Sequence, residues 1–361
     1  MFKRALMIAL ISKVGIYAGI NHVESLNSRV NSLEESVFKK EPPSERNELS
    51  FAGEFLYWQT NMTGDIYVLS HNTISAPQFG AGSSLDTNIK ARTVTFDYAP
   101  GFRVCGSYQL PFDEWGLDLI WTSFQTSASS SVDKTSTLDL HCVWDTTSIM
   151  QANHASGKMR ENFQVIDLNF GKMFRWSKPF SFRFYTGLKG AFVDEKFTIV
   201  YDGTFTDITR PTTETIVIKN NFKGIGLNNG LRFGWNLCKG LSFYTRGEVA
   251  VLWGDFAIKF DETLDVGGDI NASFHVSSSN PFNSLKTNLV AEAGFNWSLD
   301  LSNSAKLSLF AGYEFNYWPN QIIWNRYLIN QSDLTGGIAY ILQELGDVGF
   351  QGLNVGGSLS F

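Results

Sequence analysis

The sequence has 361 residues and a formal net charge of −6, from 29 Lys and Arg against 35 Asp and Glu. Because neutralising nucleic-acid phosphates requires a basic stripe, and the Lys and Arg residues form no cluster along the chain, this charge excludes a nucleic-acid-binding protein. Aromatic residues make up 14% of the chain and Gly contributes 32 residues, while charged residues make up only 18%. Strands and turns favour such a composition, so we predict an all-β fold.

Residues 1–20 begin with the basic pair Lys3 and Arg4 and continue as an apolar run that only Lys13 interrupts. A basic start followed by a short apolar run is typical of a secretory signal peptide. The run is too short and too charged for a membrane-spanning helix, which needs about 20 apolar residues. We therefore expect residues 1–20 to be a signal peptide, with an uncleaved anchor as the alternative.

Residues 21–40 place apolar side chains at alternating steps of three and four, which is a heptad pattern. The residues concerned are Val23, Leu26, Val30, Leu33 and Val37. Val at the first and Leu at the fourth heptad position favour a two-stranded coiled coil, although so short a segment is marginal on its own. We expect a periplasmic stalk that joins copies into a homo-oligomer; a chance pattern in a flexible segment is the alternative. Residues 41–48 are then a linker, and residues 49–361 one large domain.

From residue 49 onward, the chain repeats segments in which apolar and polar residues alternate. The segment from Phe180 shows this most clearly, because Phe182, Phe184 and Leu188 share one face while Arg183 and Lys189 lie on the other. Alternation with period two indicates a strand with two different faces. Ten such segments start near Ser50, Ala91, Glu114, Asn162, Phe180, Asn221, Leu241, Asn283, Ala305 and Val348.

Three features favour membrane strands over the strands of a soluble sandwich. Many segments suit the ~9 to 11 residues that a tilted strand needs to cross a bilayer. Short turns alternate with long polar connections, as in outer-membrane barrels; we place the long ones at roughly 61–90, 129–160, 198–220, 257–283 and 319–347. Aromatic residues gather at segment ends, where they would form interfacial girdles: Tyr57, Trp58, Trp115, Trp121, Phe174, Trp176, Trp235, Trp253, Trp297, Tyr317 and Trp318.

An open sheet edge in hydrocarbon would leave backbone groups unpaired, so the sheet must close on itself. We therefore predict a closed antiparallel transmembrane β-barrel of about ten strands. Twelve or more strands stay possible, because residues 132–145 and 269–276 also contain strand-like patches.

The polar faces of these strands carry charge into the barrel interior. The candidate lumen residues are Arg183, Lys189, Arg246 and Lys286, and, with the opposite sign, Asp167, Glu248, Glu292 and Glu314. Two interpretations are open. Such charges can set the ion selectivity of a channel, or they can pair across a narrow lumen and fill it.

No pattern for catalysis or for a bound cofactor is present. None of the histidines, which are His22, His71, His141, His154 and His275, falls in a predicted membrane segment. The acidic loop 261–269 lacks calcium-loop spacing. Cys105, Cys142 and Cys238 are odd in number and lack metal-ligand spacing. We expect no enzyme activity, no cofactor and no metal.

Several blocks resemble the Legionella-type major outer membrane proteins, which also occur in environmental chlamydiae. These blocks are FLYWQT (55–60), FDYAPGFRVCGSYQLPFDEWGLDLIWTSF (96–124), DLNFGKMF (167–174), GLKGAFVDEKF (187–197), GIGLNNGLRF (224–233) and GYEFNYW (312–318). The terminal Phe361 is similar to the signal that outer-membrane barrels present to their insertion machinery. The resemblance implies a porin-like barrel in the outer membrane of a Gram-negative bacterium, abundant at the cell surface and in some members involved in host contact. It also implies disulfide links in some members, which so few cysteines make doubtful here.

Together these observations predict an outer-membrane porin that passes small hydrophilic solutes and ions through a charged lumen and contacts lipid on its outer face. The alternative is a surface structural protein or adhesin whose long extracellular loops mediate host or cell contact.

Overall fold

The structure is a computed structural model, which describes residues 48–72, 88–111, 113–144, 151–177, 179–205, 208–266, 272–302, 305–329 and 338–361. The chain divides into two units, residues 1–46 and 47–361, and the strands described here belong to the second. The predicted signal peptide, the heptad segment with its five apolar residues, and nearly all of the linker lie outside the described residues. Their roles stay predictions.

The described residues form strands β1 to β13. Their bounds are β1 (Glu48–Met62), β2 (Ile66–Asn72), β3 (Ile89–Thr93), β4 (Tyr98–Gln109), β5 (Trp115–Asp133), β6 (Leu138–Cys142), β7 (Gln151–Ser177), β8 (Phe180–Phe205), β9 (Ile208–Cys238), β10 (Leu241–Val266), β11 (Ala272–Asp300), β12 (Lys306–Ile329) and β13 (Ile338–Ser360).

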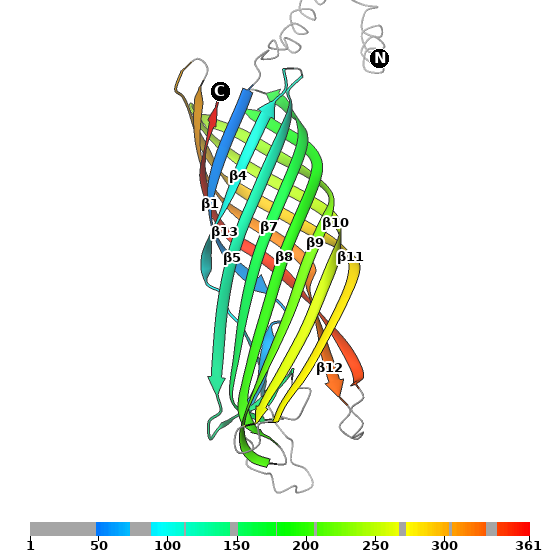
Figure 1. The fold of residues 1–361 in the computed structure, drawn as a ribbon. Helices are drawn as coiled ribbons and strands as arrows, with labels where there is room; N and C mark the ends of the chain where they lie inside the picture. Colours follow the sequence, from blue (N-terminus) through cyan, green and yellow to red (C-terminus); the bar gives the residue numbers. More distant parts are fainter. Residues whose placement is uncertain are drawn as a thin grey trace, which may run out of the picture. The chain divides into compact units, whose positions relative to one another are not determined.

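Ten of these strands form a closed ring of antiparallel neighbours, in the order β1-β4-β5-β7-β8-β9-β10-β11-β12-β13 (Figure 1). The last strand closes on the first, with Phe51 opposite Leu359. The predicted closed barrel is confirmed, and each of the ten predicted segments supplies one ring strand. The small strands β2, β3 and β6 extend the sheet beside β7.

The strands reach much further than we predicted. The four predicted short turns at 110–114, 178–179, 239–240 and 301–305 are confirmed, and Gly240 adopts a φ of +83° that its turn requires. Two predicted long loops are wrong, because strand covers most of 198–220 and 257–283. Strand also covers most of 129–160 and 319–347, and β2 and β3 lie within 61–90. The short turns of such barrels face the periplasm, so these strand extensions lie on the extracellular side.

The alternation of apolar and polar residues inverts partway along the long strands. Near the short turns, β8 points Phe184 and Phe192 outward, whereas Lys189 is buried inside the barrel. Beyond Phe192 the outward residues become polar, beginning with Asp194, and Phe197 is buried inside. The strand therefore faces lipid in one part and water in the other.

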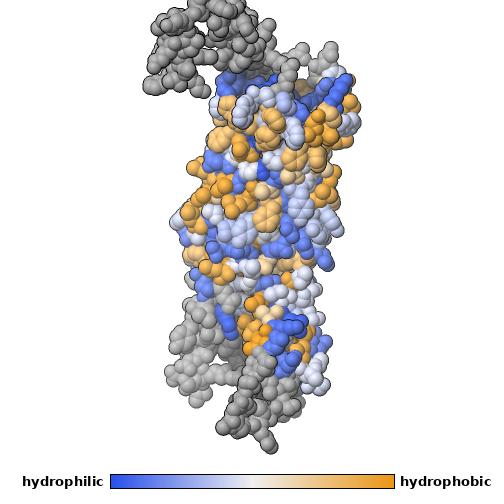
Figure 2. Space-filling view, turned by 180° about the vertical axis from the view of Figure 1, so that it is seen from behind, coloured by the Kyte–Doolittle hydropathy of each residue, from blue (hydrophilic) through white to orange (hydrophobic). Residues whose placement is uncertain are grey.

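Other long strands invert at the same level. Adjacent apolar residues mark the change, one inward and one outward: Val165 with Ile166 on β7, and Leu252 with Trp253 on β10. Below this level an exposed apolar belt surrounds the barrel, much of which Figure 2 shows near the short turns. Above it an apolar core fills the interior, and its members include Met159, Phe163, Phe197, Ile199, Ile216, Ile218, Phe222, Phe256, Ile258 and Phe260.

The aromatic girdle is correct in part. Exposed aromatic side chains at segment ends include Tyr57, Trp121, Phe174, Trp176, Trp235, Trp253 and Trp297. Two predicted members, Trp58 and Trp318, are instead buried inside the barrel. The reason is the alternation itself, because each directly follows an outward-facing residue, Tyr57 or Tyr317.

Candidate functional site: the barrel interior

The side chain of Glu314 on β12 joins two arginines inside the barrel at the level of the apolar belt. Its carboxylate accepts hydrogen bonds from both terminal nitrogens of Arg103 on β4, at 2.8 and 2.9 Å. It also accepts from Arg246 on β10 at 3.0 Å and from Asn354 on β13 at 2.8 Å. Only 1% of Glu314 is exposed. Such a buried carboxylate is tolerable only because every neighbour compensates its charge.

Both arginines have a second carboxylate partner. Arg103 contacts Glu54 on β1 at 3.0 Å, and Arg246 contacts Glu292 on β11 at 3.0 Å. The Tyr244 hydroxyl donates a hydrogen bond to Glu292 at 2.8 Å. We call this group of two arginines and three glutamates the Glu314 cluster; it ties together strands β1, β4, β10, β11 and β12.

A second cluster, centred on Lys189 of β8, lies in the same part of the barrel. The Lys189 ammonium contacts Asp167 of β7 at 3.1 Å and Glu248 of β10 at 2.6 Å. The Tyr185 hydroxyl donates to Glu248 at 2.9 Å. Arg183 on β8 pairs separately with Asp118 on β5 at 2.7 Å. The membrane-level interior is therefore ionic, and its charges compensate one another.

All eight candidate lumen residues from the sequence face the interior, and seven of them are in these ion pairs. The eighth, Lys286, donates instead to the backbone oxygen of Asn320 and lies 4.8 Å from the ring centroid of Phe256. Their predicted role in ion selectivity stays a prediction.

Sequence reasoning missed Arg103 and Glu54 as site residues. Both sit between outward-facing residues, Arg103 between Phe102 and Val104 and Glu54 before Phe55. The alternation of these two strands was signal enough to place them inside.

An aromatic layer lies directly above the ionic clusters, toward the extracellular side. The rings of Phe163 on β7 and Trp318 on β12 are 5.7 Å apart, although these strands lie opposite each other in the ring. Phe350 contacts Phe163 at 4.6 Å and Phe124 at 5.5 Å between ring centroids, and Trp58 stacks beside Phe350 at 6.1 Å. We call these five residues the aromatic layer.

The space between the ionic clusters and the aromatic layer is small. A cavity of about 20 Å³ is lined by side chains that include Arg103, Lys189, Arg246, Glu314 and Phe163. This is room for about one water molecule. The described interior at this level is packed with side chains.

Two glutamates face each other inside the extracellular part. Glu161 of β7 and Glu195 of β8 are directly opposite in register and are 2% and 1% exposed. Burial, and then the neighbouring Glu195, raise the pKa of Glu161 well above its usual range. Burial raises the pKa of Glu195 to about 8, which a hydrogen bond from Asn220 only partly offsets. At neutral pH this pair therefore holds protons.

The described part of the chain contains no group of three or more His, Cys, Asp or Glu that could bind a metal ion. His71 and His141 contact each other through Nε2 at 2.5 Å, and His154 contacts Asp133 at 2.6 Å. Cys105, Cys142 and Cys238 are free thiols. No helix among the described residues is long and apolar enough to cross a membrane. That the chain is not an enzyme stays a prediction.

The closed ring, the apolar outer belt and the charged interior together define a β-barrel of the outer membrane. Residues 41–361 match the family described as Legionella pneumophila major outer membrane protein precursor. The chain therefore belongs to the Legionella major outer membrane protein family, which confirms the resemblance seen in the sequence.

Solved structures give only remote likenesses. The outer membrane protease OmpT of Escherichia coli has 8% identity and a TM-score of 0.41, covering 89% of this chain and 97% of its own. A FadL homologue of Pseudomonas aeruginosa has 9% identity and a TM-score of 0.28, covering 88% and 92%. The toluene transporter TodX of Pseudomonas putida has 8% identity and a TM-score of 0.25, covering 87% and 89%. These values carry no functional argument. No curated protein matches the sequence.

Proposed function

We propose that this chain is a structural barrel of the outer membrane that holds a long β extension at the cell surface, and that its lumen is closed at rest. The observation that supports this proposal is the packed interior. The Glu314 and Lys189 clusters fill the barrel at the level of the belt, and the aromatic layer covers them. A hydrated ion is larger than the cavity of about 20 Å³ between these layers.

Passive diffusion of small hydrophilic solutes is the second candidate function. It is supported by the chemistry of the membrane-level lining, which is ionic where a purely structural barrel could be apolar. In an open state, Lys189, Arg246 and Glu248 would set the field on a passing ion. Opening would require Arg103 and Arg246 to leave Glu314, and the rings of the aromatic layer to separate.

Conductance of the refolded barrel in a planar lipid bilayer separates these two functions. We expect the wild-type protein to insert without stepwise current. Stepwise currents from the wild-type protein would reject the closed lumen and support the porin. Insertion is checked independently by the heat-dependent migration of the folded barrel on a gel.

A pair of variants tests whether the aromatic layer makes the seal. We expect the double variant Phe163→Ala and Phe350→Ala to conduct, because it removes the rings that meet across the barrel. The matched control removes two rings from the lipid face, Phe184→Ala and Phe192→Ala, and should stay silent. Equal silence in both variants would place the seal in the ionic clusters alone.

The surface role is tested by cell binding. Shortening the β8–β9 hairpin, whose strands run to Phe205 and from Ile208, leaves the membrane-level clusters intact. Adhesion of host cells to bacteria that produce this variant should fall if the extension makes the contact. Unchanged adhesion, with normal surface display, would contradict that role for this hairpin.

A further inference from the structure

Four basic residues stand in one row on the outer face of the barrel, in the extracellular part. Arg160 of β7 is directly opposite Lys196 of β8, Lys196 is opposite Lys219 of β9, and Lys219 is opposite Lys259 of β10. All four side chains point outward, where their exposure is intermediate or high. We call these residues the basic row. Like charges directly opposite each other destabilise a sheet, so such a row calls for a counter-charge.

The protein itself does not supply that counter-charge. Within the described part of the chain, no carboxylate lies within ion-pair distance of any residue of the basic row. Asp194, two positions from Lys196, accepts a hydrogen bond from Asn162 at 3.4 Å instead. Glu161 and Glu195 belong to the same strands but point to the opposite face of the sheet, into the barrel.

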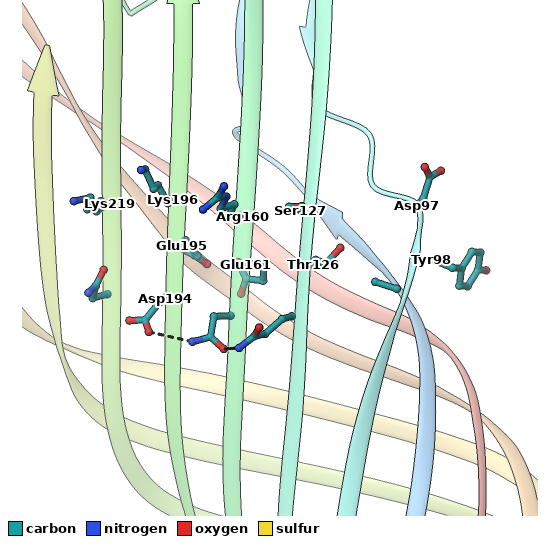
Figure 3. A pocket seen from close by; sticks show the side chains of 14 residues that line it. Asp97, Tyr98, Thr126, Ser127, Arg160, Glu161, Asp194, Glu195, Lys196 and Lys219 are labelled. Atoms are coloured by element: carbon teal, nitrogen blue, oxygen red, sulfur yellow. Dashed lines mark hydrogen bonds between the residues drawn. The ribbon is translucent and has the colours of Figure 1, made fainter. Parts of the chain in front are cut away.

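The basic row runs along a groove. Arg160, Lys196 and Lys219 line an open groove of about 810 Å³, together with Gln125, Ser127, Asn162, Asn221, Asp97, Asp194 and Tyr98. Figure 3 shows the three cations side by side on adjacent strands. The amide and hydroxyl groups around them are suited to sugar hydroxyls, and the cations to anionic oxygens.

The height of the row above the belt restricts the ligand. The row lies four residues beyond Phe192 on β8 and six residues beyond Trp253 on β10. At about 3.3 Å per residue and a tilt of roughly 40°, this is about 10–15 Å above the belt along the barrel axis. The headgroup layer of an ordinary bilayer adds only about 5–8 Å on each side, so a phospholipid phosphate lies too low.

We propose that the basic row binds the phosphorylated oligosaccharide headgroup of an outer-leaflet glycolipid. A glycolipid anchored in the lipid around the belt would carry its sugars up the outer wall of the barrel to the groove. The row covers three inter-strand spacings, about 14 Å. This length matches a headgroup with more than one phosphate better than a single phosphate ion.

The test measures binding of the detergent-purified full-length protein to rough lipopolysaccharide that carries a phosphorylated inner core. The row variant is Lys196→Gln with Lys219→Gln. Its control removes the same charge from the short-turn rim, as Lys239→Gln with Lys306→Gln, where both lysines are exposed. We expect the row variant to bind about thirtyfold more weakly, from about fivefold for each lysine, and the control to bind as the wild type does. The variant Lys196→Arg with Lys219→Arg should keep wild-type affinity.

Further arms identify the source of the anion. Dephosphorylated lipopolysaccharide and phosphatidylglycerol micelles should both bind weakly, and inorganic phosphate should not displace the glycolipid. Equal affinity of the wild type and the row variant would overturn the site. Equal binding of the dephosphorylated glycolipid, or of phosphatidylglycerol, would overturn the assignment to sugar phosphate. Heat-dependent gel migration confirms that every variant compared is folded, so a loss of binding reports on the row.

Discussion

The interior of this barrel is ionic at the level of the membrane and apolar above it. At the membrane, Lys189 and Glu314 lie inside while Phe184 faces lipid; above it, Phe197 lies inside while Lys196 faces water. The outer face of each part matches its own solvent. The inner face is then free to be ionic only where the outside is apolar, because elsewhere it must supply the hydrophobic core.

This difference shows that one strand can serve two kinds of fold. The membrane part is held by backbone pairing and buried ion pairs, whereas the extension is held like a soluble β-protein. The two parts should therefore respond differently to the loss of a charge, to pH and to the loss of apolar volume.

The largest effect is expected in the ionic part, from Glu314→Ala. This change leaves Arg103 and Arg246 buried with fewer partners, and breaking a buried pair in this way costs about 3–5 kcal/mol. Urea unfolding in detergent, followed by tryptophan fluorescence, measures the loss. Asp255→Ala, at an exposed outward position, is the control and should change stability by less than about 0.5 kcal/mol. Similar values for both variants would contradict a structural role of the Glu314 cluster.

A smaller effect, with the opposite sign, is expected from Glu195→Gln in the extension. The pKa of Glu195 rises from an ordinary 4.5 to about 8 in the folded protein. A raised pKa means that the wild type loses stability as the pH rises from about 4.5 through 8, because folding then requires either a bound proton or a buried charge.

Replacing Glu195 by Gln should therefore stabilise the barrel at pH 9 by about 1–3 kcal/mol, the usual cost of an unsatisfied buried group. At pH 4 the variant and the wild type should be nearly equal. Unfolding measured at both pH values checks this, and an equal shift at both would show that proton binding plays no part.

A still smaller effect separates the two faces of the barrel. Phe163→Leu in the aromatic layer should cost about 1 kcal/mol, because the shorter side chain leaves a gap between packed rings. Phe184→Leu on the lipid face keeps its contact with solvent hydrocarbon and should cost only about a few tenths of that. The same urea titration compares them, and the reverse order would mean that the aromatic layer is loosely packed.

Deleting Phe361 should have the smallest effect on the finished barrel. Its backbone exchanges two hydrogen bonds with Leu49 at the rim, and its side chain is exposed, so we expect a loss of about 1 kcal/mol or less. If it acts as the insertion signal, the amount of barrel assembled in cells should fall severalfold. Equal losses in refolded stability and in cellular assembly would argue against a separate signal.

The sequence was sufficient for the strand count, the short turns and the direction of most side chains, because period-two alternation sets these locally. It did not predict the inversion, which adjacent apolar pairs such as Val165 with Ile166 signal only when a strand is known to continue. The pairings across the lumen, such as Arg103 with Glu314, depend on the tilt and stagger of all ring strands. The basic row was hidden for the same reason, since register alone assembles cations that are dispersed along the chain.

The seam between β1 and β13 sets the order of folding. It joins residues that are almost a whole domain apart in the sequence, and the hydrogen bond from Trp58 to Asn354 at 2.7 Å spans 296 positions. Contacts of such long range are slow to form, because the loop that they close is costly in entropy. The hairpins β7–β8 to β10–β11 can form early, whereas the seam must wait for the last residues. Until then both edges are open to pairing with other chains, so secretion in an unfolded state and late closure belong to the same design.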